Sequence, residues 1–139
     1  MKYKVLEGIT TADVAYKVYG KTIEELFQNA AEAVEQVMVD LKTINPLNNQ
    51  QLSISNQQLD NLLLDFLNEL LFYKDSQGLV FCQFKISIRN KYELNAKLFG
   101  EKIDIKKHKL RCDVKAVTRH HLEIKKDDGK FIATIVLDI

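Results

Sequence analysis

The feature that most constrains the fold is a leucine-rich segment near the middle of the chain. Its apolar side chains recur every three or four residues, the period of an α-helix, and form one broad face. These residues are Leu59, Leu62, Leu63, Phe66, Leu67, Leu70 and Leu71. The stripe is only about two heptads long, too short to favour a coiled coil, so we expect it to pack on a sheet of the same chain. Ser55 and Gln58 predict a capping box where this helix begins.

A second helical pattern precedes it and predicts an amphipathic helix over residues 22–40. Thr22 and Glu25 have the spacing of a capping box. The apolar residues again recur at helical spacing: Ile23, Leu26, Phe27, Ala30, Val34, Val37 and Met38. We expect a chain break at residues 45–49, where Asn45-Pro46 and Asn48-Asn49 are typical of loops.

Most of the remaining chain shows the two-residue alternation of half-buried strands. We expect strands over 3–6, 14–18, 52–54, 79–88, 92–99, 113–118, 120–125 and 131–137. Gly20 is interpreted as the end of a strand, Gly100 is expected to mark a turn, and Asp127-Asp128-Gly129 predicts a hairpin turn. No linker, repeat or low-complexity tract divides residues 1–139. The sequence therefore predicts one α+β domain, with two helices on a largely antiparallel sheet.

The composition argues against a general attraction to nucleic acid or anionic membranes. The 139 residues are 46% hydrophobic and carry a formal net charge of +1. RNA contact would therefore be local or indirect. A basic stretch at residues 102–111 is expected to be a solvated loop or edge. Cys82 and Cys112 lack metal-site spacing and are expected to be buried reduced thiols. With no signal segment or membrane span, we expect a soluble cytoplasmic protein.

The sequence argues against a phosphate-binding loop and against nucleophilic catalysis. Gly20-Lys21-Thr22 resembles the end of a phosphate-binding loop, but the glycine required at position 15 is Ala15. No serine nucleophile motif occurs, and the histidines, His108, His120 and His121, are each expected to be surface imidazoles. Because neighbouring side chains in a strand alternate, His120 and His121 should point to opposite faces.

Acidic residues near the two ends of the chain are the remaining candidates. Asp13 is expected in a loop between two strands, and Asp138 lies beside the main-chain carboxylate of Ile139. Carboxylates are the ligands that Ca²⁺ and Mg²⁺ prefer. A hard-cation site is one interpretation, and ordinary solvated acids are the other.

Three stretches resemble the archease family when taken together. They are Thr11-Ala12-Asp13-Val14 with Tyr19-Gly20-Lys21-Thr22-Ile23-Glu24-Glu25-Leu26-Phe27, then Asp113-Val114-Lys115-Ala116-Val117-Thr118, and finally Ile135-Val136-Leu137-Asp138-Ile139. The resemblance extends over nearly the whole chain. It implies a non-catalytic protein that activates an RtcB-type RNA ligase, by promoting guanylylation with GTP and Mn²⁺ and allowing multiple turnover in tRNA splicing and RNA repair.

The resemblance also implies particular site residues. A divalent metal, usually calcium, with magnesium or manganese as the other choices, would bind Asp13, Asp138 and Ile139. Lys115 and His120 match a lysine and a histidine of the family and are expected to have functional roles. Ile9 and Thr10 depart from the family pattern, which has Asp-His before Thr-Ala-Asp-Val. Two alternatives stay open: a chaperone-like modulator of RNA-modifying enzymes such as tRNA methyltransferases, and a metal-dependent hydrolase, which lacks an evident general base.

Overall fold

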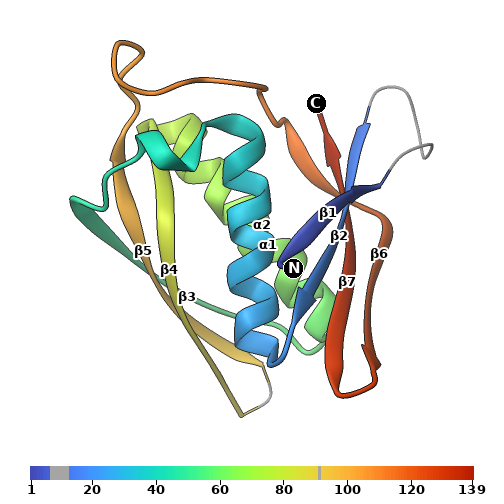
Figure 1. Cartoon of the computed structure of the whole chain (residues 1–139). Coiled ribbons are helices and arrows are strands. Elements are labelled where there is room, and N and C mark those ends of the chain that lie inside the picture. Colours follow the sequence, from blue (N-terminus) through green and yellow to red (C-terminus); the bar gives the residue numbers. More distant parts are fainter. Residues whose placement is uncertain (7–12, 91) are drawn as a thin grey trace.

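The computed structural model describes residues 1–6, 13–90 and 92–139, and it confirms the predicted α+β fold (Figure 1). The helices are α1 (Ile23–Met38) and α2 (Leu59–Gln77), with a short 3₁₀ turn η1 (Leu41–Thr43). The strands are β1 (Tyr3–Leu6), β2 (Asp13–Gly20), β3 (Asn48–Ser55), β4 (Leu79–Arg89), β5 (Glu93–Lys102), β6 (Ala116–Asp127) and β7 (Lys130–Asp138). The sequence predicts Asp13 in a loop between the first two strands, and residues 10–12 of that loop lie outside the described residues.

The strands form two antiparallel sheets that enclose the helices. One sheet has the order β1-β2-β7-β6 and the other β3-β5-β4. Figure 1 shows α1 and α2 between the two sheets, where α1 packs on β2 and β4 and α2 packs on β6 and β4. Both helices therefore bury apolar residues on more than one side.

Helix α1 begins as its sequence predicts and ends two residues early. Thr22 Oγ1 accepts a hydrogen bond from the Glu25 N–H (3.1 Å), which satisfies one of the unpaired amides at the helix start. The helix ends at Met38, before the predicted limit of residue 40, because Val39 adopts an extended conformation.

Helix α2 confirms the predicted core stripe but not its predicted cap. Six of the seven stripe residues are buried: Leu62, Leu63, Phe66, Leu67, Leu70 and Leu71. The predicted Ser55–Gln58 capping box is wrong, because Ser55 pairs with Glu93 as the last residue of β3. The helix starts at Leu59, and the Gln58 side chain makes no capping bond. Asn56 Oδ1 instead accepts from the Gln58 N–H (3.1 Å).

Tertiary pairing also corrects three predicted strand boundaries. Asn48 and Asn49, expected in a break, begin β3 and pair with β5. The separate strands predicted at 113–118 and 120–125 are one strand, β6, with an irregularity between Thr118 and Glu123. Gly100, expected in a turn, lies inside β5. A Cβ at Gly100 would lie 1.8 Å from the Val80 carbonyl oxygen, so glycine is required there by close backbone approach.

The predicted β6–β7 hairpin is confirmed. Asp127 pairs with Lys130 across a two-residue loop. The loop residues Asp128 and Gly129 have φ of 51° and 75°. Positive φ at both central residues matches the twist of antiparallel strands, which is why an aspartate-glycine pair suits this position.

Residues 103–115, which we call the strap, run from β5 to β6 across the end of α1 (Figure 1). The amides of Arg111 and Cys112 donate to the carbonyls of Met38 (2.8 Å) and Val37 (3.1 Å). The strap thereby satisfies carbonyls that the helix end leaves unpaired. Cys112 is exposed on it and Cys82 is half-buried, so the prediction of two buried thiols is wrong. In the described part of the chain, no helix is long and apolar enough to cross a membrane.

Candidate functional site

The structure brings Asp13 and Asp138 together, although they lie at opposite ends of the sequence. Asp13 is the first residue of β2, rather than a loop residue as predicted, and it pairs directly with Asp138 at the end of β7. Direct partners in antiparallel strands project to the same face, with Cβ atoms roughly 5 Å apart. The antiparallel pairing of β2 with β7 therefore makes a local pair of carboxylates.

The acid pair lies beside a small buried apolar patch. Alternate residues of a strand share a face, so Ala15 and Val136 are next to the acids on the same side of the sheet. Ala15 is 2% exposed and Val136 is 0% exposed, yet neither belongs to the cluster that forms the main core. An apolar surface next to the carboxylates lowers the local dielectric constant and strengthens their attraction for a cation.

Lys115 and Ile139 also reach this end of the sheet. The Lys115 N–H donates to the Asp138 carbonyl oxygen (2.8 Å), and the adjacent Ala116 pairs with Asp138 in the β6–β7 ladder. Ile139 follows Asp138 directly and is half-buried. The main chain at Lys115 thus fixes the end of β7, while the Lys115 side chain is exposed.

His120 is not brought to the acid pair. It lies four residues beyond Ala116 in β6, on the order of 10 Å along the strand. The prediction that His120 and His121 point to opposite faces is wrong: their rings are 4.4 Å apart, centroid to centroid. His121 has φ of 55° at the irregular part of β6, which interrupts the normal alternation.

The donor atoms of the acid pair determine which metal ions it could bind. Facing carboxylates repel when both are ionised, and a cation between them would offset that repulsion. Their oxygens, with the main-chain oxygen of Ile139, suit hard cations such as Ca²⁺ and Mg²⁺. Among residues 1–6, 13–90 and 92–139, no group of three or more His, Cys, Asp or Glu side chains could hold a metal. The donor atoms are of the kind that a hard cation prefers, but two carboxylates and one main-chain oxygen are fewer than the roughly six to eight oxygens that bind Ca²⁺.

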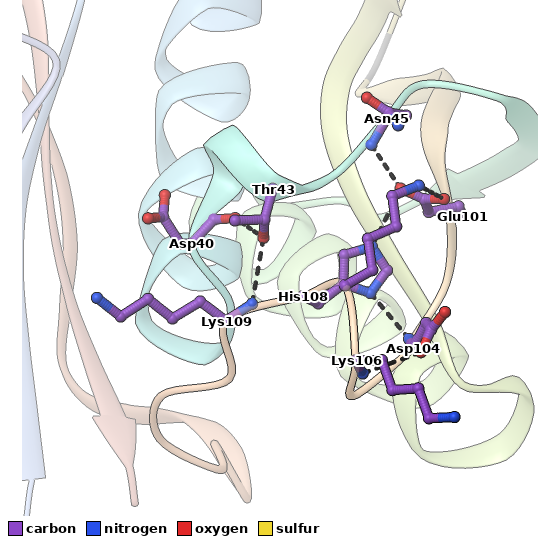
Figure 2. Close-up of polar contacts among 9 residues, drawn as sticks. Asp40, Thr43, Asn45, Glu101, Asp104, Lys106, His108 and Lys109 are labelled. Carbon is purple, nitrogen blue, oxygen red and sulfur yellow. Dashed lines mark hydrogen bonds and ion pairs between the residues drawn. The ribbon is translucent and has the colours of Figure 1, made fainter.

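A second polar cluster joins the strap to β5 (Figure 2). Glu101 accepts from Lys107 Nζ (2.6 Å), from the Asn45 N–H (2.6 Å) and from His108 Nε2 (3.0 Å). Burial acts to raise the pKa of Glu101, but the hydrogen bonds from Lys107, Asn45 and His108 outweigh it and lower the pKa to about 2. The cluster fixes an ionised carboxylate beneath the strap.

His108 is a structural residue and not the surface imidazole predicted from sequence. Its side chain is 0% exposed. The Asp104 N–H donates to His108 Nδ1 (2.9 Å), so the ring hydrogen must be on Nε2, which donates to Glu101. Both ring nitrogens are thereby satisfied within the protein, and the ring is held as the neutral Nε2–H tautomer. Figure 2 shows it between Glu101 and Asp104, with neither nitrogen left for a ligand.

Glu35 is a buried acid that the sequence analysis missed. It is 0% exposed in α1, and Oε2 accepts from the Phe81 N–H (3.1 Å) at a bulge in β4. Burial raises its pKa to about 8, against smaller lowering effects from that hydrogen bond and from Lys74. Its spacing from Ala31 and Met38 on the apolar face of α1 is the signal that could have found it.

Comparison with known proteins gives one consistent family. The sequence profile of the archease protein family matches residues 3–139. The Protein archease of Sulfurisphaera tokodaii is 38% identical over 130 residues, covering 93% of this chain and 94% of the relative. The Protein archease of Pyrococcus furiosus is 39% identical over 133 residues, with the same coverage. Neither the family description nor these names state an enzymatic activity.

Solved structures agree with the sequence comparison. The solution structure of Methanobacterium thermoautotrophicum protein 1598 has a TM-score of 0.87 and 35% identity, covering 99% of this chain and 98% of that one. The crystal structure of a Thermotoga maritima archease has a TM-score of 0.66 and 21% identity, which supports the fold alone. It covers 94% of this chain and 93% of that chain. The fold and the sequence together establish that this chain belongs to the archease family.

Proposed function

We propose that this protein activates an RtcB-type 3′-phosphate RNA ligase, promoting its guanylylation, through a divalent-cation centre at Asp13, Asp138 and the main-chain oxygen of Ile139. The observation that supports it most directly is the pairing of Asp13 with Asp138, because it joins two acids from distant parts of the sequence. Membership of the archease family supports the proposal, because an RtcB-type ligase is the partner that we expect for that family. On this proposal the protein is an accessory factor and the ligase carries out the chemistry.

The residues around the pair have distinct roles in this proposal. Asp13 and Asp138 would supply side-chain oxygens, and a bound Ca²⁺, or Mg²⁺ or Mn²⁺ in its place, would present a concentrated positive charge to the partner. Lys115 would hold Asp138 through its main-chain N–H and add a cationic side chain nearby. With a net charge of +1, the protein would contact RNA weakly or only through the ligase.

Guanylylation of a purified ligase tests the proposal. Ligase, GTP and Mn²⁺ are combined with or without this protein, and the covalent ligase–guanylate is measured over time. We expect the wild-type protein to accelerate its formation and Asp13→Ala to give the rate seen without the protein. Asp127→Ala is the matched control, because Asp127 is an exposed aspartate at the opposite end of the same sheet. Equal stimulation by Asp13→Ala and the wild type would contradict the proposed centre.

Two further variants separate the roles of the neighbouring residues. Lys115→Ala keeps the main-chain bond to Asp138 and removes only the side-chain charge, so a lower rate would assign a role to that charge. His120→Ala removes an imidazole about 10 Å along β6 from the acid pair. Loss of stimulation with a normal metal affinity would place His120 in the ligase-contacting surface.

A further inference from the structure

Among the described residues, the two sheets have four edge strands, and three of these edges have features that hinder further strand pairing. An open edge presents unpaired N–H and C=O groups to which another strand can bind. The edges of the two sheets are β1 and β6, and β3 and β4. Four features protect edge strands from further pairing: short length, charge, bulges and covering groups.

Side chains from the helices occupy part of the edges at β6 and β4, at Val117 and Phe81. Asn68 of α2 donates to the Val117 carbonyl oxygen (3.1 Å) and accepts from the Val117 N–H (3.0 Å), so its amide replaces a neighbouring strand. At β4, the Phe81 N–H donates to Glu35 of α1 beside the bulge. The irregularity in β6 distorts its edge further.

The edge at β1 is limited by charge. In the described part of the chain this strand spans Tyr3–Leu6, and one of its residues is Lys4. Lys2 lies immediately before it and is 60% exposed at its side chain. Basic edge strands are poor templates for another strand.

Within residues 1–6, 13–90 and 92–139, the edge at β3 has none of these devices. It is eight residues long and contains no charged residue and no proline: Asn48, Asn49, Gln50, Gln51, Leu52, Ser53, Ile54 and Ser55. All eight residues pair with β5 in an unbroken register. Among the described residues, the β3 backbone has one partner besides β5, the Gln50 side chain, which donates to the Gln51 carbonyl oxygen (3.1 Å).

We propose that β3 is the docking strand for a second copy of this chain, which pairs antiparallel through its own β3. A strand without charge can face itself across a two-fold axis without like-charge repulsion. If β3 paired with another edge of a second copy, a side chain would stand in its way. That side chain is Lys4 at β1, Asn68 at β6 or Glu35 at β4. The result is a symmetric dimer with one six-stranded sheet across both copies. This proposal does not depend on the proposed function in RNA ligation.

Sedimentation of the full chain over a wide concentration range tests the proposal. We expect the mass to rise from that of the chain toward twice that mass as the concentration increases. The double variant Gln51→Lys/Ser53→Lys places lysines across the two-fold axis, and we expect it to weaken association by at least about tenfold. The matched control is Gln83→Lys/Ser87→Lys, which changes the same residue types on β4 of the same sheet. We expect it to associate like the wild type.

Hydrogen exchange of the wild-type protein gives a second readout that needs no variant. We expect the amides of β3 to become more protected at high protein concentration, while those of β1 do not change. A chain that stays monomeric at every concentration would overturn the proposal. Three other results would also overturn it. They are a dimer that Gln51→Lys/Ser53→Lys leaves intact, a dimer that this variant and the β4 control disrupt equally, and hydrogen-exchange protection of β3 that does not rise with concentration.

Discussion

Glu35 lies on the buried face of α1, where Oε2 accepts the Phe81 N–H and Oε1 has no hydrogen-bond partner among the described residues. A buried, incompletely paired carboxylate is costly in its ionised form. This explains the direction of its pKa, which burial raises from 4.5 to about 8. Near neutral pH the protonated side chain predominates, so Glu35 acts as a neutral cap of the β4 bulge.

Replacing Glu35 by glutamine should remove the pH dependence that this residue gives to the free energy of unfolding. The pKa of Glu35 is raised on folding, so its contribution is fully present below about pH 4.5 and is lost as the pH rises toward 8. Between pH 4.5 and 7, the free energy of unfolding of the wild type should fall relative to that of Glu35→Gln by about 3 kcal/mol. Denaturant unfolding at several pH values measures this difference. Parallel profiles for the two proteins would contradict the assignment.

Glu101 should show the opposite pH dependence. Its pKa is lowered to about 2, so the contribution of the ionised group is present above about pH 4.5 and is lost as the pH falls toward 2. Glu101→Gln removes the charge that Lys107 pairs with, and it should cost about 2 kcal/mol at pH 7. The variant should lose less additional stability on acidification than the wild type.

Glu93→Gln is the control for Glu101, because Glu93 is an exposed acid at the other end of β5. Thermal unfolding at pH 7 and at pH 3 compares the two variants. If Glu101→Gln and Glu93→Gln had the same small effect at pH 7, the carboxylate beneath the strap would not stabilise the fold as described.

At the residue scale, sequence reasoning found Asp13 and Asp138 but not Glu35, Glu101 or the buried state of His108. The acid pair could be predicted from the sequence because it lies in stretches that resemble the archease family. Alternation along β5 puts Glu101 with the exposed Asn95 and Lys97, and the strap together with Asn45 covers it. Local sequence therefore had no means to show that a distant segment covers that position.

Among the elements, β6 is bonded on its outer edge to a side chain of α2 instead of to another strand. Asn68 makes two hydrogen bonds to the main chain of Val117, on the side of β6 where the part of the chain that the structure describes provides no strand. Asn68→Ala should therefore lower the free energy of unfolding by about 2 kcal/mol. It should also speed hydrogen exchange of the Val117 amide more than that of Val136.

The control for Asn68 is Asn61→Ala in the same helix. Asn61 bonds to Gln58 and Arg119 near the protein surface, where such contacts contribute little to stability. Denaturant unfolding of both variants gives the comparison. A cost for Asn68→Ala no larger than that for Asn61→Ala would show that the amide does not close the β6 edge.

Element types were predictable from local periodicity, while several boundaries were not. The leucine stripe and the Thr22 cap depend on side chains within a few turns of one helix, so the sequence contains the necessary information. The ends of β3 are set by pairing with β5, which overrides the turn preference of Asn48 and Asn49. In β6, one backbone irregularity changed the predicted orientation of His120 and His121.

For the whole molecule, the proposed centre joins the start of β2 to the end of β7. A cation would bind to this centre in the folded state. It would have little affinity for the unfolded chain, in which the two acids are far apart. Added Ca²⁺ should therefore raise the melting temperature of the wild type, by an amount that grows with the ion concentration. Asp13→Asn should abolish most of this increase, and Asp127→Asn should leave it unchanged. An equal increase in all three proteins would contradict binding at the acid pair.

The overall class of fold was predictable, but the division into two sheets was not. Strand patterns indicate which residues alternate, but they do not state which strands are neighbours. The helices pack on both sheets because their buried surfaces are broad, as the leucine stripe already indicated for α2. The meeting of Asp13 and Asp138 follows from the pairing of β2 with β7, which is a property of the complete topology.

Multiple-turnover RNA joining tests the central claim most directly. A limiting amount of RtcB-type ligase is supplied with excess RNA ends, GTP and Mn²⁺, and the joints formed per ligase molecule are counted with wild-type protein, Asp138→Asn or Asp127→Asn. Asp138→Asn preserves the shape of the side chain and the main-chain bond to Lys115. We predict many joints per ligase with the wild type and Asp127→Asn, and only the level seen without activator for Asp138→Asn. Full turnover with Asp138→Asn, folded and at the same concentration, would contradict the proposal that the acid pair is the functional centre.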